Sequence, residues 1–271
     1  MNVFIFTGLL ISLIANNMAD ERERKRIVNG QDVQLFDVPS QVALMMRDED
    51  GYFDKRCGAV LIALNKILTA AHCVKGVDLS DLRAVVGLLN YYGPLTGYEQ
   101  VVPFSKSNMY EDHWVIQGME IYDIAVLTLA TPVRPNKNVE VVKLADEIDR
   151  YVNTSCIVSG WGYNNKSLGT HPNRLQKAIT ILISSTDCKK FWPKFAEALD
   201  KELFLCVFNK NGTSGRPNSI CSGDSGGPLY CGPNKDILVG TAVGNDVKCN
   251  GMLPQVFTNV AAYKDWLADK L

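Results

Sequence analysis

The sequence predicts an all-β protein of the sandwich or barrel type. Short apolar runs rich in Val, Ile and Leu recur along the chain, and clusters of Gly, Pro, Asn or Asp separate them. Runs of this length and spacing are typical of β-strands joined by turns. The chain has 271 residues, of which 46% are hydrophobic and 21% charged, so it can bury one large core or two small ones.

The elements follow from this pattern in chain order. Strands are expected at Gln41–Met46, Ala59–Leu64, Leu82–Leu89, Ile124–Ala130, Leu175–Ile183, Ile237–Val243 and Gln255–Val260. A helix is expected over Ala261–Leu271, because it places Trp266 and Leu267 on one side and charges on the other, and a shorter one over Thr186–Trp192. The two prolines and several polar residues of Thr131–Asn138 predict a linker between two halves of similar size.

The N-terminal end carries one strongly apolar run, Val3–Ala15. This run is too short to cross a bilayer, and its length suits the apolar part of a signal peptide. No Lys or Arg precedes it, and the small-residue cleavage pattern at Asn17 and Ala19 is weak. A buried core strand or a retained anchor are the alternatives. We expect residues 1–19 to be a signal peptide and the protein to be secreted, because the segment that follows has the composition of a propeptide.

Residues 20–26 are all charged, four basic and three acidic, and cannot pack into a core. One interpretation is a solvated linker. The pair Lys25-Arg26 directly before the apolar pair Ile27-Val28 favours a short propeptide that ends at Arg26. On this interpretation residues 27–271 form the mature domain.

Net charge and cysteine content restrict the partners and the compartment. The formal net charge of -1 gives no electrostatic reason to expect nucleic acid or an anionic membrane as partner. The eight cysteines form no CxxC pair and no zinc-finger spacing, so no metal site is predicted and disulfides are expected over free buried thiols. Three N-x-S/T triplets, at Asn153, Asn165 and Asn211, are compatible with a secreted glycoprotein, although such triplets often arise by chance.

Three short motifs contain the residue types of nucleophilic catalysis. His72 lies in Thr-Ala-Ala-His-Cys, Asp123 begins Asp-Ile-Ala-Val-Leu, and Ser225 lies in Gly-Asp-Ser-Gly-Gly-Pro. Taken singly, these are a core histidine, the end of a strand and a flexible turn. Taken together, they supply a nucleophile, a base, a carboxylate that orients the base, and backbone donors for an oxyanion. The chain order His, Asp, Ser is one of the known orders of this constellation.

From Ile27 to Leu271 the chain resembles the trypsin/chymotrypsin family of secreted serine proteases. The resemblance rests on the three motifs together with Ile27–Gly30, Cys57-Gly58, Ser159–Gly162 and the C-terminal segment that contains Trp266. It implies two six-stranded antiparallel β-barrels with a C-terminal helix, and an active site in the cleft between them. It also implies a serine endopeptidase that hydrolyses protein or peptide substrates through an acyl-enzyme and needs no cofactor.

The resemblance assigns the catalytic roles. His72 is the general base and acid, Asp123 orients it, and Ser225 is the nucleophile. The backbone N–H groups of Gly223 and Ser225 form the oxyanion hole.

The resemblance also implies activation from a zymogen. A trypsin-like activating protease would cut after Arg26, and the new ammonium of Ile27 would pair with the carboxylate of Asp224. Protein inhibitors are further expected partners, and a monomer is the default state. Leu88 stands where calcium-binding relatives carry an acidic residue, so no calcium site is expected.

Sequence alone allows 105 pairings of the eight cysteines. The pairs that the resemblance implies are Cys57–Cys73, Cys156–Cys231, Cys188–Cys206 and Cys221–Cys249.

The specificity pocket departs from the family pattern. Ser219 stands at the pocket base where trypsins carry Asp, so a preference for Lys or Arg is not expected, and Ile220 beside it makes the wall apolar. Gln255 replaces a glycine and should partly fill the pocket or offer its amide to the substrate. The segment that replaces the usual Ser-Trp-Gly wall is Val243, Gly244 and Asn245.

Two hypotheses follow from the altered pocket. In the first, the protein is an active endopeptidase with unusual specificity. In the second, the pocket is blocked and the protein is a catalytically impaired homologue that acts as a binding or decoy protein. The complete triad and activation motif favour the first.

Overall fold

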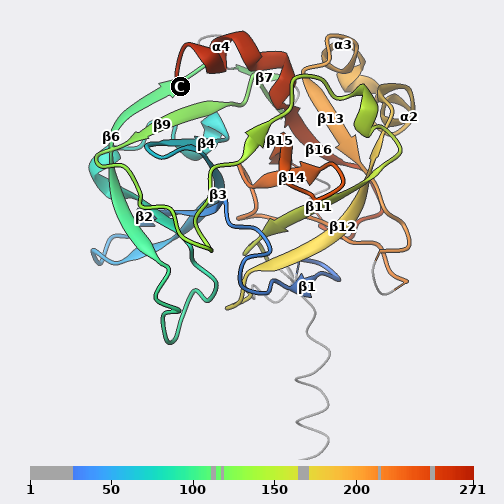
Figure 1. Ribbon diagram of the computed structural model, residues 1–271. Helices are drawn as coiled ribbons and strands as arrows, with labels where there is room; N and C mark the ends of the chain where they lie inside the picture. Colours follow the sequence, from blue (N-terminus) through green and yellow to red (C-terminus); the bar gives the residue numbers. More distant parts are fainter. Residues whose placement is uncertain (1–26, 111–113, 117–118, 164–170, 213–214, 245–247) are drawn as a thin grey trace, which may run out of the picture.

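The computed structural model describes residues 27–110, 114–116, 119–163, 171–212, 215–244 and 248–271. The predicted signal peptide, the propeptide with Arg26, and the positions Asn165 and Asn245 lie outside the described residues. The described chain forms two closed antiparallel β-barrels that lie side by side (Figure 1).

The first barrel contains six strands in the order β2-β3-β4-β9-β6-β5, and β5 pairs with β2 to close it. Side chains alternate between the core and solvent along β6, where Val102 and Phe104 are buried and Val101 and Pro103 are exposed. The strands are β2 (Gln41–Arg47), β3 (Phe53–Ala63), β4 (Lys66–Thr69), β5 (Leu82–Val86), β6 (Gln100–Met109) and β9 (Ala125–Leu129).

The second barrel has the order β12-β11-β14-β15-β16-β13, and the pairing of β12 with β13 closes it. Its strands are β11 (Ser155–Gly160), β12 (Gln176–Ile183), β13 (Phe204–Val207), β14 (Pro228–Cys231), β15 (Ile237–Gly244) and β16 (Gln255–Asn259). Short strands β1 (Gln31–Asp32) and β10 (Lys143–Leu144) extend it, and β7 (Trp114–Ile116) pairs with β8 (Met119–Ile121) apart from both barrels. The all-β prediction and the two six-stranded barrels are thus confirmed.

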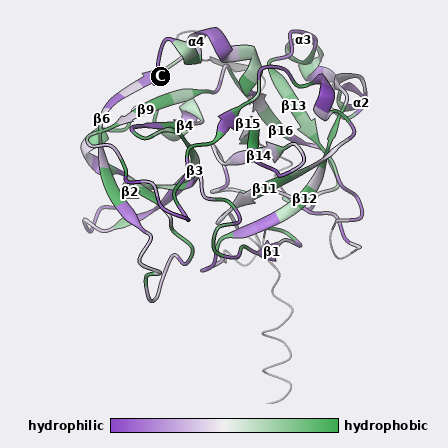
Figure 2. Cartoon of the chain, in the orientation of Figure 1, coloured by the Kyte–Doolittle hydropathy of each residue, from purple (hydrophilic) through white to green (hydrophobic). Residues whose placement is uncertain are grey.

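Helices are few, and hydrophilic stretches on α2 and α4 contrast with the apolar strands (Figure 2). Helix α2 (Ser185–Phe191) begins after Ser184, whose hydroxyl accepts from the Asp187 N–H, and it corresponds to the helix predicted at 186–192. Two further helices are α3 (Ala196–Asp200) and the C-terminal α4 (Lys264–Ala268). The predicted helix 261–271 is shorter than expected, because a 3₁₀ turn at Val260–Tyr263, capped by Asn259, occupies its first residues.

The two barrels share a continuous apolar interface. One buried cluster contains Leu68 and Ile124 from the first half together with Trp161, Leu238 and Leu267 from the second. Residues 131–138, the predicted linker, lie between β9 of the first barrel and β10, which pairs with β15 of the second. The candidate catalytic residues lie on the two sides of this interface.

Among the described residues, no helix is long and apolar enough to cross a membrane.

Candidate active site

His72 and Asp123 are brought together by the first barrel. His72 lies in a 3₁₀ turn (Ala71–Cys73) that follows β4, and Asp123 directly precedes β9, which pairs with β4. The Nδ1 atom of His72 is 2.7 Å from Oδ2 of Asp123, and the backbone N–H of His72 donates to Oδ1 at 2.9 Å. The carboxylate is fully buried, whereas 27% of the His72 side chain is exposed.

This pairing determines which nitrogen of His72 carries the proton. An ionised carboxylate only accepts hydrogen bonds, so Nδ1 must be the donor and Nε2 keeps its lone pair in the neutral ring. The arrangement therefore presents an unprotonated Nε2 that can act as a general base.

The backbone around Asp123 is bent sharply. Tyr122 has a left-handed backbone (φ 55°), and its carbonyl oxygen accepts from the Ile124 N–H at 2.8 Å. Thr258 on β16 donates its hydroxyl to the backbone oxygen of Asp123 at 3.0 Å. These contacts direct the carboxylate inward to His72, and they tie the loop to the second barrel.

Ser225 is carried by the second barrel and is pressed against the first. Its carbonyl oxygen accepts from the Gly58 N–H at 2.8 Å. Gly226, with φ 73°, leaves no room for a side chain: a Cβ there would overlap Thr69 Oγ1 and lie 2.6 Å from the Gly58 oxygen. The glycine after Ser225 is therefore required both by its φ and by the closeness of the two barrels.

Replacing Gly226 by alanine should displace Ser225. The left-handed φ costs about 1–3 kcal/mol for a non-glycine residue, and the overlap adds a comparable amount. We expect a lower urea midpoint and a loss of kcat/KM. Gly76→Ala is the matched control, because Gly76 has φ 72° and no atom within 4 Å of the added Cβ. Equal destabilisation of the two variants, with activity kept, would contradict the packing role of Gly226.

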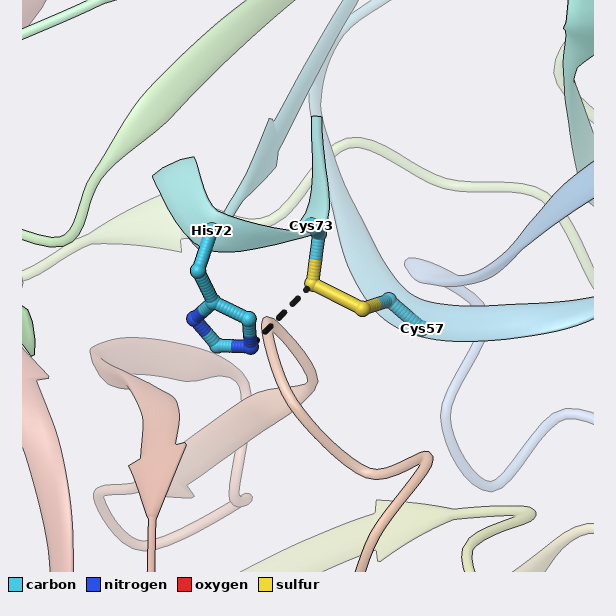
Figure 3. A group of neighbouring side chains, drawn as sticks. All are labelled: Cys57, His72 and Cys73. Carbon is cyan, nitrogen blue, oxygen red and sulfur yellow. Dashed lines mark hydrogen bonds between the residues drawn. A yellow bond between two sulfur atoms is a disulfide. The ribbon is translucent and has the colours of Figure 1, made fainter. Parts of the chain in front are cut away.

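Cys73 is a common neighbour of the two halves of the site. Its Sγ lies 3.7 Å from His72 Nε2 and 3.8 Å from the carbonyl oxygen of Ser225. Figure 3 shows this sulfur beside the imidazole and joined to Cys57. Cys57, His72 and Cys73 resemble a metal-ligand group, but the disulfide leaves neither sulfur as a thiolate ligand. The sulfur of Cys73 instead lies near both the imidazole of His72 and the backbone of Ser225.

The backbone next to Ser225 has the form of an anion-binding loop. Gly223 has φ 93° and is half-buried, and Ser225 is also half-buried. Within the described chain, the N–H groups of Gly223 and Ser225 donate to no other residue, whereas those of Asp224, Gly226 and Gly227 do. Two such N–H groups beside a serine can donate hydrogen bonds to an oxygen atom that becomes negatively charged during a reaction.

Asp224 points away from Ser225 into the interior of the second barrel. Its Oδ1 accepts from the Gly162 N–H at 2.6 Å and its Oδ2 from the Cys221 N–H at 2.9 Å. Burial raises the pKa of this carboxyl, while the backbone donors and Lys55 act in the opposite direction. A buried carboxylate of this kind favours a nearby cation.

The segment that starts at Ile27 is docked on the same barrel. The Ile27 side chain is fully buried, Val28 pairs with Ser219, and Asn29 Nδ2 donates to the Pro217 oxygen at 2.5 Å. Ile27 therefore lies against the loop that leads to Asp224.

Gln255, predicted to line the specificity pocket, lies in the interior of the second barrel. It is fully buried, its Oε1 accepts from the Ile220 N–H at 2.9 Å, and its Nε2 donates to the Asn218 oxygen at 3.0 Å. The Ile220 N–H and the Asn218 oxygen belong to the residues on either side of Ser219. The hydroxyl of Ser219 donates to the Ile220 oxygen at 2.8 Å. Both ends of the Gln255 amide therefore bond to backbone groups.

The other pocket positions are placed as follows. Ile220 is buried in the core cluster of the second barrel that also contains Ile27 and Phe257. Val243 lies at a bulge between β15 and β16 and packs against the cluster of Cys188 and Phe195. Among the residues that the structure describes, none lies within 4 Å of the Cβ that Gly244, beside it, lacks.

Four disulfides join the eight cysteines, and the pairs are those that the resemblance implies. They are Cys57–Cys73, Cys156–Cys231, Cys188–Cys206 and Cys221–Cys249.

Three contributors to the site were not predicted from the sequence: Tyr122, Thr258 and Lys55. Lys55 on β3 reaches across to the second barrel, where Nζ donates to the Trp161 oxygen and lies beside Gly223. A lone lysine between aspartate and arginine gives no signal of this position.

Comparison with known proteins agrees with this geometry. The trypsin family matches residues 27–267. The chain is 30% identical to fibrinolytic enzyme isozyme C of Lumbricus rubellus, over 90% of this chain and 99% of that protein. It is 30% identical to a chymotrypsin-like serine proteinase of Haliotis rufescens, with 96% of each covered, and 31% identical to chymotrypsin-like elastase family member 3B of Macaca mulatta, with 91% and 93% covered. The chain therefore belongs to the trypsin family of serine endopeptidases.

Proposed function

We propose that the protein is a secreted serine endopeptidase, made as a zymogen, that cleaves after a small side chain and not after Lys or Arg. The observation that carries the catalytic part is the double contact of Asp123 with the Nδ1 atom and the backbone N–H of His72. It leaves Nε2 as the base beside the loop of Ser225.

The reaction follows from these roles. His72 Nε2 takes the Ser225 hydroxyl proton as Oγ attacks the carbonyl carbon of the substrate. The N–H groups of Gly223 and Ser225 stabilise the oxyanion, and His72 then gives its proton to the leaving amine. Water, activated by the same base, releases the acyl group.

Activation by cleavage after Arg26 is part of the proposal. The buried side chain of Ile27 and the pairing of Val28 with Ser219 support it, because they hold the new end near the Asp224 loop. A new Ile27 ammonium would supply the cation that the buried Asp224 carboxylate favours. The basic end of the propeptide suits a trypsin-like activator.

The specificity proposal rests on Gln255. Its buried amide occupies the space around Ser219, and Ser219 offers no negative charge to Lys or Arg. A pocket filled in this way leaves room for a small residue before the scissile bond. Secretion through residues 1–19, a monomeric state and control by protein inhibitors complete the proposal.

The test is covalent labelling of Ser225. The full chain is treated with a fluorophosphonate probe before and after cleavage behind Arg26. We expect labelling only after cleavage, none in Ser225→Ala, and normal labelling in Ser222→Ala, which removes an exposed hydroxyl from the same loop.

Absence of labelling in a folded, correctly cut chain would overturn the proposal. It would support the alternative of a binding or decoy protein whose pocket is blocked. Equal labelling before and after cleavage would overturn the activation step alone.

A further inference from the structure

Lys55 links the first barrel to the oxyanion loop of the second. Its Nζ donates to the carbonyl oxygen of Trp161 and lies 2.7 Å from His171 Nδ1. The ring of Tyr163 is 5.9 Å from the same atom.

The peptide group between Trp161 and Gly162 connects Lys55 to Asp224. The oxygen of this peptide accepts from Lys55 Nζ, and its N–H donates to Asp224 Oδ1 at 2.6 Å. An ammonium at one end and a carboxylate at the other polarise the peptide in the same direction, so each hydrogen bond strengthens the other. Lys55 is thereby a counter-charge of the buried carboxylate without touching it.

Lys55 also packs against the loop that carries the oxyanion donors. A Cβ on Gly223 would lie only 2.9 Å from both Cε and Nζ of Lys55. The loop is therefore held on one side by Lys55 at Gly223 and on the other by Gly162 at Asp224.

We propose that Lys55 is a positioning residue for the oxyanion hole and that full activity requires its ammonium to be charged. The inference rests on the proposed function, because it assigns Lys55 to the loop of Gly223 and Ser225. In the cut enzyme Lys55 is a second counter-charge of Asp224 beside the proposed Ile27 ammonium, so loss of the Lys55 charge would weaken the contact through the Trp161–Gly162 peptide and loosen the loop. It would lower kcat more than it raises KM.

The groups around Lys55 determine the pH range over which its ammonium loses a proton. Burial lowers the pKa of Lys55 to about 8, while Asp224 and Asp54 act to raise it. His171 faces it with a pKa that burial and Lys55 lower. The other titratable groups around it in the described part of the chain are the phenols of Tyr91, Tyr92 and Tyr163, and burial raises the pKa of Tyr91.

Activity and stability should therefore change in opposite directions above about pH 8. The lowered pKa means that the unfolded chain keeps the Lys55 proton up to 10.5, while the folded chain loses it near 8. Over this interval the contribution of Lys55 to stability rises with pH. Titration of Lys55 therefore does not itself destabilise the fold over this interval, and a thermal midpoint measured at each pH separates a fall in activity from unfolding.

The experiment measures kcat, KM and the pH profile of the cut enzyme and of three variants. We expect wild-type kcat/KM to fall above about pH 8, and the fall to move to higher pH in Lys55→Arg, whose charge does not titrate there. In Lys55→Met, kcat at pH 7 and the affinity for a peptide boronic acid should both fall about 10-fold, less than for loss of a direct oxyanion donor. Lys106→Met, an exposed lysine on β6, is the matched control with the same charge change.

Two results would overturn the inference. A Lys55→Arg profile identical to wild type would assign the alkaline fall to another group, such as the Ile27 ammonium. Unchanged kcat and boronic acid affinity in folded Lys55→Met would exclude a role in the oxyanion hole. Failure of the proposed function itself is distinguishable, because Ser225 of the wild-type chain would then not react with the fluorophosphonate probe.

Discussion

Replacing Asp123 by asparagine should lower kcat about 10⁴-fold at neutral pH and leave the fold intact. Asp123 uses one oxygen for the backbone N–H of His72 and the other for Nδ1. Asparagine has one oxygen and one NH₂ group. If the oxygen keeps the backbone contact, the NH₂ group faces Nδ1 and makes it an acceptor. The ring proton then lies on Nε2, which can no longer take the proton of Ser225.

The tautomer itself is the decisive measurement for this variant. Nitrogen NMR of labelled histidine should show Nδ1–H in the wild type and Nε2–H in Asp123→Asn, with similar thermal midpoints. Asp81→Asn, a half-exposed carboxylate that pairs with Arg47 at the surface, is the control and should keep full activity. An unchanged tautomer with the same loss of kcat would mean that the carboxylate acts by charge alone.

Gln255→Gly should open the specificity pocket to large side chains. The substitution removes a buried side chain that spans from β16 to both sides of Ser219. We expect kcat/KM for substrates with Phe or Tyr before the scissile bond to rise by at least about 10-fold, as the cleared space accepts an apolar ring. The variant should also lose about 1–3 kcal/mol of stability, because the Ile220 N–H and the Asn218 oxygen lose their partner.

The variant Gln255→Met separates the effect of the space that the Gln255 side chain occupies from the effect of its hydrogen bonds. Methionine has a similar length but bonds to neither backbone group, so this variant should lose stability and gain no activity on Phe or Tyr substrates. Both variants are assayed with a peptide library in which each amino acid in turn stands before the scissile bond. No gain in Gln255→Gly would show that Gln255 does not limit the pocket.

The sequence predicts the strands well where short apolar runs rich in Val, Ile and Leu supply core residues. The runs at 41–46, 175–183 and 255–260 all coincide with strands: β2 and β16 are mostly buried along their length, and burial alternates along β12, where Ile179 and Ile181 face outward. The C-terminal helix is harder to delimit. Its first turn is tightened by the cap at Asn259, a side-chain contact that the apolar periodicity of 261–271 does not report.

The candidate site also contains residues that the sequence predicts and residues that it does not. The candidate catalytic residues are visible in the sequence because local motifs surround His72, Asp123 and Ser225. Residues that act through space are not visible, since Lys55, Thr258 and Tyr122 lie far from Ser225 in the chain and belong to no motif. The sequence places Gln255 at the predicted pocket but does not decide whether its amide bonds to the substrate or to the protein. Its two backbone partners depend on how β16 lies against residues 218–220.

The division of the site between two barrels governs when the chain can first act. His72 and Asp123 belong to the first barrel, whereas the loop of Ser225 is held by the second, which closes only when β13 pairs with β16 at residues 255–259. A chain emerging from the ribosome must therefore be synthesised past residue 259 before the proposed base, His72, and the proposed nucleophile, Ser225, can meet in a completed site. A nascent chain that has formed only the first barrel carries half of the site and cannot cleave its neighbours.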